Sequence, residues 1–153
     1  MLQVLIQYHY LLLQGFLTTI KLLGCIMLIG IPFGILLGVI GGRYSKEIFT
    51  FIKGARFITK VIPVLVFLFW LHYPLQGLLG IVIDPFWTTI FALGLLNTIA
   101  VASIVSSELE LLPKAYREAG TTLNLSPNQI IRYIELPLLF RRTIPQLLLI
   151  QAS

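Results

Sequence analysis

Side chains able to do chemistry are few in this sequence, and its longest polar stretch is residues 113–137, PKAYREAGTTLNLSPNQIIRYIELP. No nucleophile is paired with a base, no spacing is typical of metal ligands, and no glycine-rich loop ends in the Gly-Lys-Ser/Thr that holds phosphate. The single cysteine, Cys25, lies in an apolar run and can form neither an internal disulfide nor a metal site. We therefore predict no catalytic, cofactor-binding or metal-binding residue. The chemistry that remains is recognition, for which a carboxylate such as Glu118 can pair with a basic partner.

The composition is that of an integral membrane protein. Of the 153 residues, 58% are hydrophobic and 11% are charged, and the mean hydropathy is +0.95. Soluble domains carry about 25% charged residues, and one this poor in charge would have too little polar surface to cover its core. The net charge of +5 comes from basic residues between apolar runs, so it indicates topology in a lipid bilayer and not nucleic-acid binding.

Three apolar segments are long enough to cross a bilayer, which takes about 20 residues. We expect an all-α, polytopic helical membrane protein with one transmembrane domain, residues 1–153, and full spans at about residues 15–40, 61–83 and 86–105. Gly41-Gly42-Arg43 is expected to end the first span, and His72-Tyr73-Pro74 interrupts the second. A last apolar stretch, residues 143–153, is too short to cross as a helix and is interpreted as a partial span.

The basic residues predict how the spans are oriented. Five of them lie within residues 43–60 and five within 114–142, while residues 1–14 and the turn around Asp84 have none. Because positively charged loops stay in the cytoplasm, both basic regions are predicted to be cytoplasmic and the N-terminus to lie outside. Residues 106–142 then form a cytoplasmic loop after the third span.

Small and polar residues inside the spans predict helix contacts. In the first span glycine recurs every four residues, which makes a stripe that another helix can approach closely. The spacing leaves open whether that helix is internal or belongs to a second subunit. Polar residues in the third span are candidates to line a pathway or to hydrogen-bond a neighbouring helix. The glycines are Gly30, Gly34 and Gly38, and the polar residues are Asn97, Thr98 and Ser103.

Residues 113–137 predict two short helices joined by a sharp corner. Pro113 suits a first helical turn, and Asn124 tolerates the left-handed conformation with which helices often stop. Ser126 as N-cap and Gln129 three residues later are typical of a capping box at the start of the second helix.

The second helix is predicted to be amphipathic. Its isoleucines share one face, for which packing within the protein is favoured, and Glu135 is expected to lie largely away from that face. Pro137 is expected to end the helix. The isoleucines are Ile130, Ile131 and Ile134.

This stretch resembles the cytoplasmic loop of bacterial ABC-importer permeases, whose pattern is Glu-Ala-Ala, three residues, Gly, nine residues, Ile, one residue, Leu-Pro. Here Glu118-Ala119-Gly120 opens the pattern, Asn124 takes the glycine place, and Ile134 and Leu136-Pro137 follow at the same spacing. Gly120 for alanine and Asn124 for glycine are departures. The runs GFLTT at 15–19 and PFW at 85–87 are also similar to polar amino-acid importer permeases.

The resemblance implies the permease subunit of an ATP-driven ABC importer in a bacterial cytoplasmic (inner) membrane. Such a subunit is a transporter component and not an enzyme. Its partners are a separate ABC ATPase subunit, a second permease subunit in a homodimer or heterodimer, and an extracytoplasmic solute-binding protein. In this family the cytoplasmic loop docks into the ATPase and couples it to the spans. The docking residues implied here are Lys114, Arg117, Glu118, Ala119, Gly120, Leu123, Asn124, Ile134, Leu136 and Pro137.

The implied substrate is an amino acid or a similar small polar solute. Polar amino-acid permeases often carry a glutamate and, three residues later, an arginine, at places where this sequence has Ser103 and Ser106. Residues three apart share a helix face and could pair, so losing both avoids an unpaired charge near the membrane. The particular substrate is left open.

A different class of function also fits the sequence, namely a small membrane scaffold or assembly subunit without transport activity. A membrane enzyme is disfavoured because no catalytic constellation is present. Members of the resembling family continue through at least one more span, so this chain is expected to be a fragment or a truncated form, unstable or inactive alone.

Overall fold

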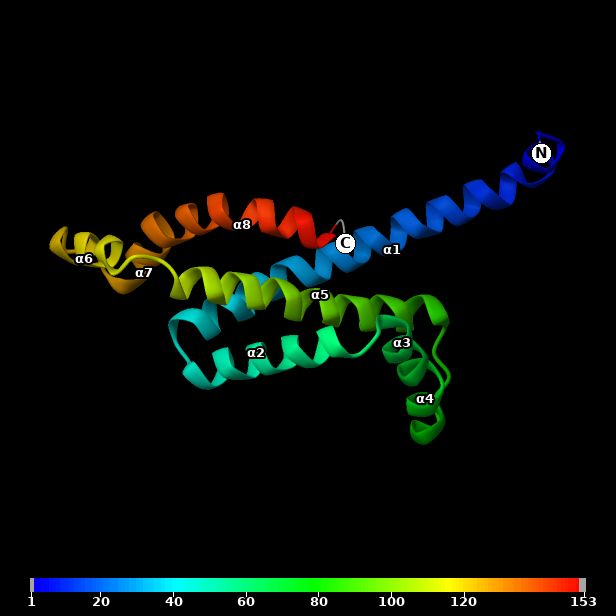
Figure 1. The fold of residues 1–153 in the computed structure, drawn as a ribbon, viewed down its shortest axis with the longest axis horizontal. Helices are drawn as coiled ribbons and strands as arrows, with labels where there is room; N and C mark the ends of the chain where they lie inside the picture. The colour runs from blue at the N-terminus through cyan, green and yellow to red at the C-terminus, as the bar shows by residue number, and fades with distance from the viewer. Residues whose placement is uncertain (1, 152–153) are drawn as a thin grey trace.

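The computed structural model describes residues 2–151, which form an all-helical fold (Figure 1). Its elements are α1 (Leu2–Arg43), α2 (Lys46–Val61), α3 (Val64–His72), α4 (Pro74–Leu79), α5 (Pro85–Glu110), α6 (Lys114–Thr122), α7 (Pro127–Ile130), a π-helix (Ile131–Glu135) and α8 (Leu136–Gln151).

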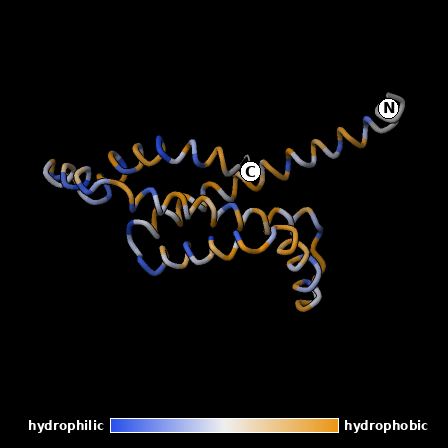
Figure 2. Tube along the Cα trace, viewed as in Figure 1, coloured by the Kyte–Doolittle hydropathy of each residue, from blue (hydrophilic) through white to orange (hydrophobic). Residues whose placement is uncertain are grey.

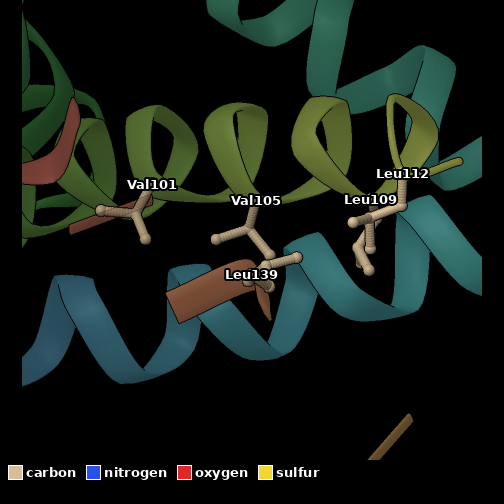
Figure 3. Packing of buried hydrophobic residues seen from close by; sticks show 5 residues of the cluster. All are labelled: Val101, Val105, Leu109, Leu112 and Leu139. Atoms are coloured by element: carbon tan, nitrogen blue, oxygen red, sulfur yellow. The ribbon is translucent and has the colours of Figure 1, made fainter. Parts of the chain in front are cut away.

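Helices α1 and α5 lie side by side at the centre of the molecule, and α2 and α8 pack against α5 (Figure 1). The apolar core lies along α5, from which Val101, Val105 and Leu109 point inward (Figure 3). Leu112, just after α5, and Leu139 of α8 complete this cluster. The core is therefore built between the central helix pair and the start of α8.

Glycine allows the close approach of α1 to α5. A Cβ atom at Gly34 would lie 2.5 Å from Cβ of Val101, and one at Gly38 would lie 2.6 Å from Cβ of Val105. Packed interiors leave no space for such overlap, so a larger residue would push the two helices apart. The stripe thus faces a helix of the same chain, and Gly42 continues its four-residue spacing.

Two helical segments are long and apolar enough to cross a bilayer, His9–Arg43 and Pro85–Glu110. A third candidate is the pair Lys46–Val61 and Val64–Leu79, which is bent by 97°. Apolar residues follow α1, α3 and α5, whereas polar residues gather around α6 and the turn between α1 and α2 (Figure 2). By length and composition, the described residues therefore hold two candidate spans, or three if the bent pair is one span.

The second span differs from the single segment expected at residues 61–83. Helix α2 occupies residues expected to be a basic loop, and it ends at Val61. Ile62 is extended, with φ −83° and ψ 122°, as residues before proline prefer. Pro63 has no N–H with which to continue the helix, so the chain bends before α3.

The ends of the first span also differ from the prediction. Helix α1 begins at Leu2 and continues through Gly41 and Gly42 to Arg43. A Cβ atom at Gly41 would lie 2.8 Å from Cδ1 of Ile52. These two glycines therefore lie inside the last turn of the helix and serve packing, while α1 ends at Arg43, the last residue of the predicted Gly41-Gly42-Arg43 stop.

The prediction that Pro137 ends a helix is also wrong. Helix α7 passes through the π-helix into α8, and Pro137 is the second residue of α8. The N–H of Leu136 donates to the carbonyl of Ile131, five residues back. This wider turn lies directly before a proline that has no N–H for the regular helical bond. The expected loop 106–142 thus contains the end of α5 and the start of α8, and the described part of 143–153 continues α8.

Candidate functional site

The corner, residues 113–135, lies at the polar end of the molecule, where α6 turns back through α7 and the π-helix (Figures 1 and 2). Helix α6 stops at Asn124, whose φ is 55°. The N–H of Leu125 donates to the carbonyl of Gly120 at 3.1 Å, and the N–H of Asn124 donates to that of Thr121 at 3.0 Å. This is a Schellman stop, so the prediction that Asn124 stops the helix in the left-handed conformation is confirmed.

The start of α7 is fixed by the predicted capping box. The N–H of Gln129 donates to Oγ of Ser126 at 3.4 Å. In return the N–H of Ser126 donates to Oε1 of the Gln129 side chain at 2.8 Å. The box is confirmed, and it orders the chain immediately after the left-handed Asn124.

Gly120 joins the two sides of the corner. It is buried, and a Cβ atom there would lie 2.8 Å from Cγ1 of Ile130 and 3.2 Å from Cδ1 of Ile134. Ile130 is 2% exposed. The glycine that replaces the alanine of the family pattern therefore lets α6 sit directly on the isoleucine face.

The predicted docking residues fall into two groups. Gly120 is buried, and three others are partly buried, namely Arg117 and Ile134 within the corner and Leu136 at the start of α8. The remaining six are exposed and are Lys114, Glu118, Ala119, Leu123, Asn124 and Pro137. Leu123, an apolar side chain at the tip of the corner, is 72% exposed. The exposed group offers one basic, one acidic and one large apolar side chain.

Sequence reasoning missed the most buried charge of the corner. Glu135 was expected to lie away from the packed face, but its side chain is only 3% exposed. Arg117 Nε donates to its Oε1 at 2.9 Å, and Arg43 Nε lies 3.7 Å from its Oε2. The π-helix changes the register of the face, which a 3.6-residue period does not predict. The one signal in the sequence is that Glu135 is an acid in a stretch, residues 113–142, where basic residues outnumber acidic ones.

The candidate pathway residues lie on α5. Asn97 is buried against Gly30, where a Cβ atom would lie 2.6 Å from its Nδ2. The hydroxyl of Thr98, also buried, donates to the carbonyl of Gly94 at 2.8 Å. Ser103 is partly buried, and its carbonyl accepts the Ser106 hydroxyl at 3.2 Å. Asn97 and Thr98 therefore sit at a helix contact.

A polar cluster joins α3, α4 and α5 at the opposite end of the molecule. Gln76 Nε2 donates to the Thr88 hydroxyl at 3.0 Å, and it lies 3.1 Å from Nδ1 of His72. Gln76 Oε1 accepts the N–H of Ile83 at 2.9 Å. These bonds satisfy a buried amide and tie the 80–84 turn to the helices. Across residues 2–151, no group of three or more His, Cys, Asp or Glu side chains is placed to hold a metal ion.

The fold and the corner define a class: a polytopic helical membrane protein with a capped and packed polar helical corner at one end of its candidate spans. Residues 30–151 match the family described as the binding-protein-dependent transport system inner membrane component. The chain belongs to this family.

Relatives with assigned names are similar over most of the chain. It is 28% identical over 137 residues to the arginine transport system permease protein ArtQ of Bacillus subtilis (strain 168), covering 88% of this chain and 61% of that protein. It is 29% identical over 130 residues to the glutamine transport system permease protein GlnP of Escherichia coli (strain K12), covering 80% of this chain and 58% of that protein. The chain thus spans about three fifths of these relatives.

The fold is also similar to that of a solved structure, an amino acid ABC transporter with histidines. The TM-score is 0.79 at 21% identity, covering 95% of this chain and 67% of that chain. This likeness supports the helical arrangement described above.

Proposed function

We propose that this chain is the transmembrane subunit of an ATP-driven ABC importer and that the corner docks onto a separate ATPase. The observation that carries the proposal is the corner itself, a capped and packed turn that presents Glu118 and Leu123 outward. A rigid corner transmits displacement to the spans, whereas a flexible loop would absorb it. The other partners are a second permease subunit and an extracytoplasmic solute-binding protein.

The orientation we propose puts the corner in the cytoplasm and the N-terminus outside. The turn between α1 and α2 and the corner lie at one end of the molecule, and α4 lies toward the other end (Figure 1). The two basic regions, residues 43–60 and 114–142, both reach the end of the molecule that holds the corner. This is the arrangement that the positive-inside rule favours.

The solute we propose is an amino acid or a similar small polar molecule. The names of the relatives, which concern arginine and glutamine transport, support this class. Ser103 and Ser106 leave α5 without the acid and base pair of many amino-acid permeases, so this chain is expected to differ from them in the solute it prefers.

The test is a charge reversal at the corner, Glu118→Lys. With the protein expressed beside its ABC ATPase, we expect the variant to lose most ATPase co-purification and ATP-dependent uptake, because an exposed carboxylate would no longer meet a basic groove. Glu110→Lys is the matched control, since Glu110 is an exposed acid outside the corner, with its Oε2 3.3 Å from Lys53 Nζ.

Three outcomes separate the hypotheses. Loss in Glu118→Lys with retention in the control supports docking. Equal retention in both variants contradicts the role of Glu118. A wild-type chain that carries no ATPase at all would favour a scaffold or assembly subunit.

A further inference from the structure

Glu135 occupies a position that the proposed docking does not explain. Its carboxylate is 3% exposed and lies between arginines from two distant segments, Arg43 at the end of α1 and Arg117 on α6. A buried charge is tolerated only where other groups replace its water. The protein therefore retains a charged joint at the point where α1, α6 and the π-helix meet.

The two sides of this joint are unequal. Arg117 Nε is hydrogen-bonded to the carboxylate at 2.9 Å. Arg43 Nε lies 3.7 Å away, and among the described residues neither it nor the facing Oε2 of Glu135 has a hydrogen-bond partner. The next residue makes a similarly long contact, since the Tyr44 hydroxyl lies 3.5 Å from Oδ1 of Asn128 on α7. The corner is thus tightly bonded internally and more loosely bonded to α1.

A force on α6 reaches Glu135 by two routes. One is the Arg117 bond. The other is the contact of Gly120 with Ile130 and Ile134, the second of which directly precedes Glu135. From Glu135 the charge acts on the last turn of α1, the helix that packs along α5.

We propose that Glu135 is a positioning residue that holds the corner to the end of α1, with Arg43 as the releasable contact. This inference rests on the proposed docking of the corner to an ATPase. The joint then makes α1 follow the corner as the ATPase moves it.

The first test does not depend on an ATPase and measures amide hydrogen exchange in the chain as purified from membranes together with the subunits that accompany it. Glu135→Gln keeps the size of the side chain and removes its charge. We expect exchange in α6 and in the last turn of α1 to rise about tenfold, because the carboxylate charge that strengthens the contacts with both arginines is removed. Glu110→Gln is the control, since it breaks only the exposed contact with Lys53 and is expected to change exchange in neither segment. Unchanged exchange in Glu135→Gln would overturn the proposal.

The second test measures solute transported per ATP hydrolysed by the assembled complex. Glu135→Gln is expected to lower this ratio severalfold while the ATPase still co-purifies, and Glu135→Asp to restore part of it. Arg43→Gln, which leaves the Arg117 bond in place, is expected to lower the ratio with α6 still protected, so a folding defect in Glu135→Gln does not decide the question.

The outcomes are distinct. A merely structural role would reduce the amount of complex and leave the ratio per complex unchanged, which would overturn the positioning role. If the wild-type chain recruits no ATPase, the proposed function fails, and the exchange experiment still decides whether Glu135 holds the corner to α1.

Discussion

Single residues at the corner show which departures from a family pattern are compatible with its geometry. Asn124 stands where the pattern has glycine, and it adopts the left-handed φ of 55° that such a position requires. Gly120 stands where the pattern has alanine, and Ile130 occupies the space that an alanine Cβ would need. The asparagine is therefore compatible with the backbone angle at its position, and the glycine with the close contact at its own.

Asn124→Ala is expected to destabilise the corner by about 1 kcal/mol, because an alanine side chain disfavours the left-handed conformation. Asn124→Gly is the control and is expected to leave the stop intact. Limited proteolysis around residues 122–126 would measure the difference. Equal resistance of the alanine variant and the wild type would contradict the importance of the left-handed stop.

Gly34→Ala is expected to destabilise the α1–α5 contact by about 1–3 kcal/mol through overpacking, since its Cβ would lie 2.5 Å from Cβ of Val101. Gly24→Ala is a matched control on the same helix, because a Cβ there meets nothing within 4 Å. The midpoint of thermal unfolding in detergent is expected to fall for the first variant, and to stay or rise for the second. A similar midpoint for both would mean that α1 and α5 can separate without cost.

The elements are shaped by prolines that act in two different ways. Pro63 follows an extended residue and separates α2 from α3 with a bend of 97° between the helices on its two sides. Pro137 lies inside a helical run, where the π-helix before it widens the turn. The difference lies in the preceding residues, which are extended in one case and helical in the other.

Ser126→Ala is expected to weaken the start of α7 by about 1 kcal/mol, because the Gln129 N–H loses its side-chain acceptor and only the bond from the backbone N–H of residue 126 can remain. Ser126→Asp keeps an acceptor at the cap and is expected to behave like the wild type. Hydrogen exchange of the Gln129 amide, which donates to Ser126 Oγ, would report the loss directly. A slow Gln129 amide in the alanine variant would contradict the role of the box.

The whole molecule separates its chemistry by position along the spans. Polar residues gather around the corner and the turn between α1 and α2 (Figure 2), while large apolar side chains such as Phe16, Phe33 and Phe91 are exposed along the helices. Apolar exposure of this kind is expected of surfaces that meet lipid or other transmembrane helices.

The proposed orientation predicts opposite labelling of two exposed leucine positions. In a chain with Cys25 replaced by alanine, an impermeant thiol reagent is expected to label Leu79→Cys in intact cells. It is expected to label Leu123→Cys only after permeabilisation, because the corner is proposed to be cytoplasmic. Leu79 is 60% and Leu123 is 72% exposed, so access does not limit either reaction. The reverse pattern would invert the topology.

Local features of the fold and site were predictable from the sequence. The left-handed stop at Asn124 and the box at Ser126 and Gln129 depend on residues within a few positions of one another. The four-residue glycine spacing showed that α1 has a face for close packing, although not which helix fills it. These features arise from backbone sterics and short-range hydrogen bonds, which a neighbouring sequence specifies directly.

Contacts between distant segments became visible only in the assembled fold. The glycine stripe meets α5, and Glu135 meets both Arg43 and Arg117. The residue types involved are evident in the sequence, but their pairing depends on the extra residue in the π-turn and on the length of α1. A hydrophobic period of 3.6 residues predicts neither the π-helix nor the length of α1. The π-helix rotates every later side chain about the helix axis, and the end of a helix depends on what packs beside it.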